Sequence, residues 1–247
     1  MVQRYFITLA YDGTAYHGWQ VQPNGRSVQE VLQQALSLLL STPTDIVGAG
    51  RTDAGVHARM MVAHFEHDGP VLDGVQLAYR MNRLLPRDIA IESIVPVDRE
   101  MHARFSATKR TYHYYLHTCK NPFLRHYSWE VHYPLDFEIM NQGATLLIGE
   151  KDFACFCKSG TDVKTTICNV SEAYWKPVDG TDGQWVFTIS ANRFLRNMVR
   201  AVVGTLIDLG RHRMTMEQLE QTLGKGTRCD AGESVPGHAL FLDAVEY

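Results

Sequence analysis

The order of apolar patterns in the first hundred residues is the feature that most constrains the fold of this chain. Residues 5–11 alternate large apolar side chains with smaller or polar ones, which predicts a strand. Ser27, with a glutamate three residues later, begins a helical apolar pattern that stops at Pro43. The chain is therefore expected to start with a strand followed by a helix.

Further strands and a second helix are predicted in the rest of this half. Short β-rich runs at 46–47 and 60–65 flank a loop that is rich in glycine. Asp73 can cap a second helix, which Pro86 ends, and residues 89–95 form another β-rich run. The resulting order, β-α-β-β-α-β, is that of a ferredoxin-like unit.

The second half of the chain repeats this mixture. The expected strands cover residues 111–117, 165–175, 185–191 and 241–246, and the expected helices cover residues 137–147 and 194–208. We therefore predict an α+β protein with two ferredoxin-like lobes, residues 1–103 and 104–247, joined near residues 97–106. Their antiparallel sheets, either separate or continuous, would enclose a cleft.

Composition excludes several classes of protein. The chain has 247 residues, of which 45% are hydrophobic and 21% are charged, an ordinary globular balance with ample apolar material for a core. No apolar stretch approaches the roughly 18 residues of a membrane span, and the first residues do not resemble a signal peptide. We therefore expect a cytoplasmic protein that does not bind a membrane.

The cysteines do not indicate a disulfide framework. There are five of them, without paired spacing, so free thiols are expected. Cys155 and Cys157 could begin a zinc site, but the phenylalanines at 153 and 156 favour a buried strand, so we predict no metal there.

Charge is unevenly distributed although the net charge is only −3. Residues 193–213 contain five arginines and a single acid, Asp208. Further basic clusters include Arg80, Arg83 and Arg87, and Arg104, Lys109 and Arg110. If such clusters converge, they form a confined positive groove for a polyanion; scattered, solvated charges are the alternative.

The segment from Gly48 to His57 has the composition of a functional loop. Three glycines surround Arg51, Thr52, Asp53 and His57. Glycine permits tight turns and close backbone approach. The alternative is that Asp53 only stabilises a turn. The segment is not a phosphate-binding loop, and no dinucleotide-binding motif follows a strand, so no nucleotide cofactor is expected.

Two further segments combine basic residues with a defined geometry. The predicted helix 194–208 separates an apolar side from a side with Arg200, where Gly204 leaves space. Residues 104–115 interleave basic and aromatic side chains, including Tyr112, as single-stranded RNA binders do. A plain amphipathic helix and ordinary strand tyrosines are the structural alternatives.

These segments carry a resemblance to a known family. The strings YDGTAYHGWQVQPN, SVQEVLQQAL, GAGRTDAGVHA, HARFSATKRTYHYYL, ANRFLRNMVRAVVGTL and ALFLDAVEY resemble, in the same order, successive blocks of the tRNA pseudouridine synthase A family. GRTDAGVHA is a highly specific string. The resemblance implies a homodimeric isomerase that converts uridine to pseudouridine at positions 38–40 of the tRNA anticodon arm, without cofactor or metal.

The resemblance also assigns roles to individual residues. Asp53 matches the catalytic aspartate, Arg51 the arginine of the same loop, Tyr112 the tyrosine at the target uracil, and Arg200 the arginine that pairs with the catalytic carboxylate. The expected RNA contacts are Arg104, Lys109, Arg110 and Arg196. Arg193 and Ala239 depart from the residues usual in the family.

The expected chemistry needs few groups. Breaking the N1–C1′ bond and forming a C5–C1′ bond requires a nucleophile or charge stabiliser, for which one carboxylate suffices. Whether Asp53 attacks C1′ or the ring, or assists elimination, is left open. Arg51 would fill the space of the flipped base, and Tyr112 would hold the ring. The alternative functions are a non-catalytic RNA-binding module and a cleft hydrolase that uses Asp53 and His57.

Overall fold

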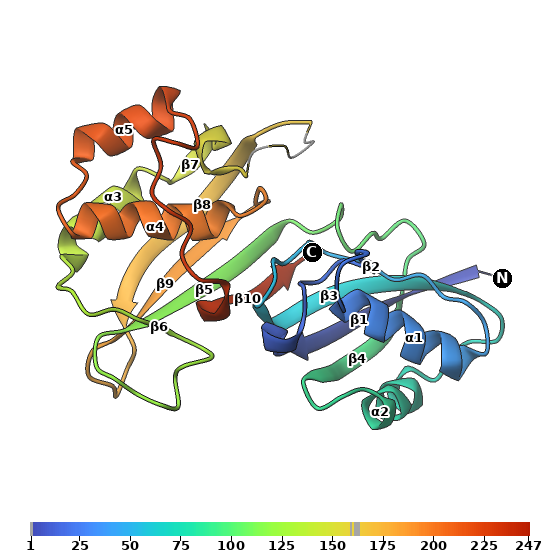
Figure 1. Ribbon diagram of the computed structural model, residues 1–247. Helices are drawn as coiled ribbons and strands as arrows, with labels where there is room; N and C mark the ends of the chain where they lie inside the picture. The colour runs from blue at the N-terminus through green and yellow to red at the C-terminus, as the bar shows by residue number, and fades with distance from the viewer. Residues whose placement is uncertain (1, 159, 161–163) are drawn as a thin grey trace. The chain divides into compact units, whose positions relative to one another are not determined.

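The computed structural model describes residues 2–158, 160 and 164–247 (Figure 1). The chain divides into two compact units: unit 1 comprises Met1–Thr108 and Phe241–Tyr247, and unit 2 comprises Lys109–Leu240. This division differs from the expected lobes 1–103 and 104–247. The reason is that the C-terminal strand joins unit 1, where the Thr108 N–H donates to the Glu246 carbonyl at 2.8 Å.

Unit 1 has the predicted β-α-β-β-α-β order. Its elements are β1 (Val2–Tyr11), α1 (Val28–Leu40), β2 (Val47–Gly48), β3 (His57–Asp68), α2 (Gly74–Leu84), β4 (Ile89–Val97) and β10 (Leu240–Glu246). The strand order is β4-β1-β3-β10, and β2 pairs with β3. β1 is antiparallel to both neighbours, whereas β10 is parallel to β3. The ferredoxin-like arrangement is thus extended by the last strand of the chain.

The caps of the two helices in unit 1 are those expected from the sequence. The Ser27 side chain accepts the Glu30 N–H, and the Asp73 side chain accepts the Gln76 N–H, so each satisfies a free donor of a helix start. Each helix buries one apolar face, and the two helices contact each other. The core of unit 1 lies between that face and the sheet.

Unit 2 is also a layer of helices on an antiparallel sheet. Its elements are β5 (Lys109–His117), β6 (Trp129–Glu130), α3 (Phe137–Thr145), β7 (Gly149–Asp152), β8 (Ile167–Pro177), β9 (Gln184–Ala191), α4 (Met198–Gly210) and α5 (Met216–Lys225). The strand order is β5-β9-β8-β7, with β6 parallel to β5. α4 contacts both α3 and α5. The predicted α+β class is confirmed.

Two local expectations in unit 2 were wrong, and one helix was missed. The predicted helix 194–208 begins only at Met198, because Asn197 is left-handed, with φ at 65°. α5 was not predicted, although Thr215 and Gln218 form a capping box at its start. Cys155 and Cys157 belong to a 3₁₀ turn and its end rather than to a strand.

The structure also describes the cysteines and the apolar character of the helices. All five cysteines are free thiols. Cys155 is buried, which raises the pKa of its thiol to about 11, whereas Cys157 is only half-buried. Within residues 2–158, 160 and 164–247, no helix combines the length and apolar character that crossing a bilayer requires.

Candidate active site

The loop that carries Asp53 packs against residues 13–19 at very short range. A Cβ atom on Gly13 would lie 2.0 Å from the Val56 carbonyl oxygen. A Cβ atom on Gly18, which has φ at +87°, would lie 2.2 Å from the Thr52 carbonyl oxygen. Only glycine fits at these two positions, because any side chain would displace the loop.

Backbone hydrogen bonds hold the loop in this position. The Trp19 N–H donates to the Thr52 carbonyl at 3.2 Å, and the Gly55 N–H donates to the Tyr16 carbonyl at 3.3 Å. Within the loop, the Val56 N–H donates to the Asp53 carbonyl at 3.1 Å. The backbone of Asp53 is therefore fixed on both sides.

Aromatic side chains of the same unit complete the support of the loop. The hydroxyls of Tyr11 and Thr52, both buried, are 2.9 Å apart. The buried Trp19 indole fills the space beside Gly48, where a Cβ atom would lie 2.5 Å from the ring. The Tyr16 hydroxyl donates to Asp88 at 2.7 Å, and burial, with this carboxylate beside it, raises the pKa of Tyr16.

The two candidate residues of the loop differ from Thr52 in their exposure. Arg51 is exposed and Asp53 is half-buried, whereas Thr52 between them is buried. The Thr52 side chain thus anchors the loop, and the charged side chains on either side of it stay accessible. The structure places Arg51 and Asp53 on one loop whose backbone is hydrogen-bonded to residues 16–19.

His57 supports the fold of the loop. It lies at the start of β3, and its side chain is 1% exposed. The Nδ1 atom accepts the Gly13 N–H at 3.0 Å and lies 3.1 Å from the Asp12 carboxylate, and the ring stacks on Phe241 with centroids 4.5 Å apart. A base for an attacking water needs access that this side chain lacks, which disfavours the hydrolase alternative.

Tyr112 lies in β5 of unit 2. Its position in the ladder is opposite Ile189 of β9, and the residue is 9% exposed. Its ring meets the Phe194 ring edge to face, with centroids 5.1 Å apart. The loop that precedes α4 thus covers one edge of this tyrosine.

Arg200 in α4 is held by reciprocal hydrogen bonds with Val235. The Arg200 Nε donates to the Val235 carbonyl at 2.7 Å, and the Val235 N–H donates to the Arg200 carbonyl at 3.2 Å. A Cβ atom on Gly204 would lie 1.8 Å from the Glu233 carbonyl oxygen. The space that Gly204 was expected to leave is therefore occupied by residues 231–236, the α4-flanking segment.

Sequence reasoning missed Arg228, which holds the α4-flanking segment. Its guanidinium donates to the carbonyls of Ala231 at 3.3 Å and Gly232 at 2.9 Å, and to the Ser234 hydroxyl at 2.8 Å. The Gly232 N–H donates to the Thr205 hydroxyl at 2.8 Å. Arg228 thereby stabilises the segment whose Val235 carbonyl orients the Arg200 guanidinium. In the sequence, the short spacing between Arg228 and Gly232 is the signal that could have indicated this role.

The expected RNA contacts are divided between the two units. Arg104 is exposed in unit 1, whereas Lys109 and Arg110 are half-buried at the start of β5 in unit 2. Arg110 donates to the Asn192 carbonyl at 2.6 Å, which places it beside the loop that carries the exposed Arg196. The structure thus brings together the guanidinium of Arg110 and this loop.

A fixed aspartate loop and accessible arginines are typical of an enzyme that acts on an anionic substrate. The profile of the family described as tRNA pseudouridine synthase matches residues 7–106 and 144–247. The chain belongs to the tRNA pseudouridine synthase family. The prediction of an isomerase of this family is therefore confirmed.

The chain is also similar to individual proteins over its whole length. A tRNA pseudouridine synthase A of Bacteroides thetaiotaomicron is 56% identical, with 100% of this chain and 91% of that protein covered. A protein of the same name from Bacteroides fragilis is 54% identical, with 100% and 97% covered. The one from Porphyromonas gingivalis is 50% identical, with 99% and 97% covered.

Proposed function

We propose that this protein isomerises uridine to pseudouridine at positions 38–40 of the tRNA anticodon arm. The observation that carries the proposal is the GRTDAGVHA loop, which holds Asp53 half-buried on a backbone fixed by Gly13 and Gly18. Membership of the family and the names of the full-length relatives support tRNA as the substrate.

The reaction would proceed as a rearrangement within one nucleotide. The N1–C1′ bond breaks, the uracil turns, a C5–C1′ bond forms, and the proton on C5 is released while N1 gains one. Asp53 would act as the nucleophile or charge stabiliser. Arg200 would keep the carboxylate ionised, because a guanidinium is always charged and presents a forked set of donors.

The target base must leave its stack before it reaches Asp53. Extrusion costs a few kcal/mol, which contacts to the emptied space and to the flipped ring offset. Arg51 is exposed next to Asp53 and would fill the emptied space. Tyr112 would contact the flipped uracil.

Binding of the rest of the tRNA would depend on its phosphates. Arg104, Lys109, Arg110 and Arg196 are proposed as phosphate contacts, since such contacts position an RNA without reading its bases. We also propose that the protein acts as a cytoplasmic homodimer and that it uses no cofactor or metal, because the rearrangement involves no redox step and no phosphate transfer.

Release of tritium tests the function directly. A tRNA transcript labelled with tritium at C5 of its uridines should lose label to water when this protein is added. The reason is that C5 loses its hydrogen when the C5–C1′ bond forms. A matched transcript with cytidine at positions 38–40 should lose none. Tight binding without release would indicate a binding module, and strand or base loss would indicate a hydrolase.

A further inference from the structure

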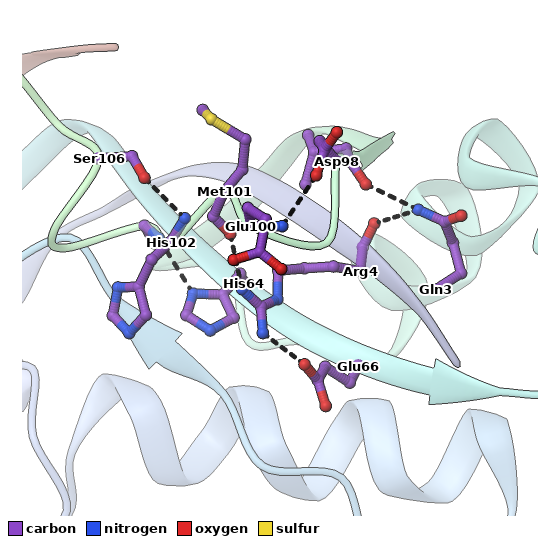
Figure 2. A network of polar contacts seen from close by, with 11 residues as sticks. Gln3, Arg4, His64, Glu66, Asp98, Glu100, Met101, His102 and Ser106 are labelled. Carbon is purple, nitrogen blue, oxygen red and sulfur yellow. Dashed lines mark hydrogen bonds and ion pairs between the residues drawn. The ribbon is translucent and has the colours of Figure 1, made fainter. Parts of the chain in front are cut away.

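Residues 101–106 of unit 1 form a turn that side chains from several parts of the unit hold in place. We name these residues the 101–106 turn. Arg4 donates to the Met101 carbonyl at 2.9 Å, and Tyr247 donates to the Ala103 carbonyl at 2.7 Å. The His102 N–H donates to the Ser106 hydroxyl at 2.9 Å (Figure 2). The turn is thus tied to both the first strand and the C-terminal residue of the chain.

Two histidines supply the remaining acceptors of the turn. The His64 Nδ1 accepts the Ala103 N–H at 3.1 Å, and the His102 Nδ1 accepts the N–H groups of Arg104 at 3.1 Å and Phe105 at 3.3 Å. The two imidazoles lie edge to face with centroids 4.6 Å apart (Figure 2). Burial is the main cause that lowers the pKa of His64 to about 4 and also lowers the pKa of His102.

The neutral form is the one this geometry requires. A protonated imidazole nitrogen cannot accept a hydrogen bond, so both Nδ1 atoms must be free of protons to hold the turn. The lowered pKa of each ring keeps it neutral at neutral pH. The turn therefore has a fixed backbone under the conditions in which an RNA enzyme works.

This fixed turn presents an apolar ring to solvent. Phe105 is 76% exposed, although its ring contacts the His102 ring at a centroid distance of 4.4 Å. The Arg104 guanidinium lies over the Phe105 ring, 5.5 Å from its centroid. A rigid, exposed aromatic ring loses little conformational entropy when a flat partner covers it.

The charge around the ring favours an anionic partner. The part of unit 1 that contains the turn, residues 99–106, has two arginines, Arg99 and Arg104, and one acid, Glu100. Exposed aromatic rings that stack on bases beside cations that contact phosphates are the usual means of binding unpaired RNA. A nucleotide matches both groups that the turn presents, because its base can cover the ring and its phosphate can bind the guanidinium beside the ring.

We propose that Phe105 stacks on an unpaired base of the RNA substrate while Arg104 binds a neighbouring phosphate. This inference rests on the proposed function, because it assigns a subsite for the tRNA that this enzyme modifies. The contact adds affinity for RNA and takes no part in the rearrangement. Base stacking is tolerant of sequence, since every base has an aromatic face.

Equilibrium binding of an unmodified tRNA transcript tests the proposal. Phe105→Ala should raise Kd about 5- to 150-fold, the range found when a stacking ring is removed. Phe105→Trp should restore affinity, whereas Phe105→Leu, which is apolar but not aromatic, should not. Val71→Ala is the control, because Val71 is an apolar side chain of the same unit that is 81% exposed, lies between Asp68 and Asp73 in the sequence, and should leave Kd unchanged.

Other outcomes overturn the proposal. An unchanged Kd for Phe105→Ala would remove the ring from the RNA contacts, and a Phe105→Leu protein as tight as wild type would replace stacking by general apolar contact. A change in oligomeric state with unchanged Kd would assign the ring to a protein interface. Tritium release by the wild-type protein is measured in parallel, so failure of the proposed function remains distinguishable from failure of this subsite.

Discussion

The two candidate catalytic regions are held in place by different means. The Asp53 loop in unit 1 rests on backbone atoms, because Gly13 and Gly18 allow residues 52–56 to approach without side chains between them. Arg200 in unit 2 depends on a second segment, which Arg228 stabilises through side-chain hydrogen bonds. The proposed catalytic carboxylate thus rests on backbone packing, whereas its proposed charge partner also depends on side-chain hydrogen bonds.

The difference predicts two kinds of sensitivity. Backbone packing tolerates no added atom, since no flexible group can move away from a new Cβ. Side-chain hydrogen bonds fail gradually, because a shorter or uncharged replacement removes one or two bonds and leaves the rest. Variants that add a Cβ atom at a packed glycine should therefore lose stability abruptly, and variants that remove donors of Arg228 should lose activity in steps.

Gly18→Ala should have the largest effect on stability. The new Cβ would meet the Thr52 carbonyl oxygen at 2.2 Å on a residue with φ at +87°. We expect a loss of about 3–4 kcal/mol in the free energy of unfolding, measured by urea denaturation. Gly50→Ala in the same loop is the control, because its Cβ would meet nothing within 4 Å. Equal stability of the two variants would show that the loop is not fixed by backbone packing.

Gly204→Ala should have the next largest effect on stability. Its Cβ would lie 1.8 Å from the Glu233 carbonyl oxygen and would push the α4-flanking segment away. Because alanine also favours the helix, we expect a net loss of about 2 kcal/mol in the free energy of unfolding. Gly224→Ala in α5 has open space and should gain up to about 1 kcal/mol. Thermal denaturation should show a lower melting temperature for Gly204→Ala and an unchanged or higher one for Gly224→Ala.

Arg228→Met should affect turnover more than stability. It removes the donors to Ala231, Gly232 and Ser234, so the Val235 carbonyl no longer orients Arg200. We expect a loss of about 1–2 kcal/mol in stability and a fall in kcat with KM for tRNA nearly unchanged. Arg125→Met is the control, since Arg125 is exposed and donates to the carbonyl of Pro122, three residues before it. A rise in KM alone would contradict a positioning role for Arg228.

Tyr11→Phe should have the smallest effect. It removes the 2.9 Å hydroxyl contact with Thr52 and keeps the ring. We expect a loss of about 1 kcal/mol in the free energy of unfolding, because a buried hydroxyl is left without one partner. The double variant Tyr11→Phe with Thr52→Val should recover part of this loss. If it does not, the contact is not what anchors Thr52.

Much of the fold follows from local patterns. The caps at Ser27 and Asp73 and the alternating strands depend on nearby residues, so the sequence alone predicts them. The start of α4 does not, because the left-handed Asn197 donates its side-chain amide to Ser234, far along the chain. The C-terminal strand likewise joins unit 1 through pairing with β3, which no local pattern indicates.

The candidate site shows the same limit. The density of glycine and polar residues in the Asp53 loop indicated a site loop with close backbone approach, whereas the glycines that allow that approach, Gly13 and Gly18, lie outside the loop. Gly204 looked like open space beside Arg200, yet its neighbour is the backbone at Glu233. Such pairings depend on tertiary contacts, so a helical wheel cannot distinguish an accessible surface from a packed one.

The central claim is that the Asp53 carboxylate performs the chemistry. Single-turnover formation of pseudouridine in a tRNA transcript, with wild-type and Asp53→Asn proteins at concentrations that saturate the RNA, tests it most directly. The asparagine keeps the shape of the side chain and removes its charge, so we predict an unchanged Kd for tRNA and no product. An Asp53→Asn protein that forms pseudouridine at the wild-type rate would contradict the claim.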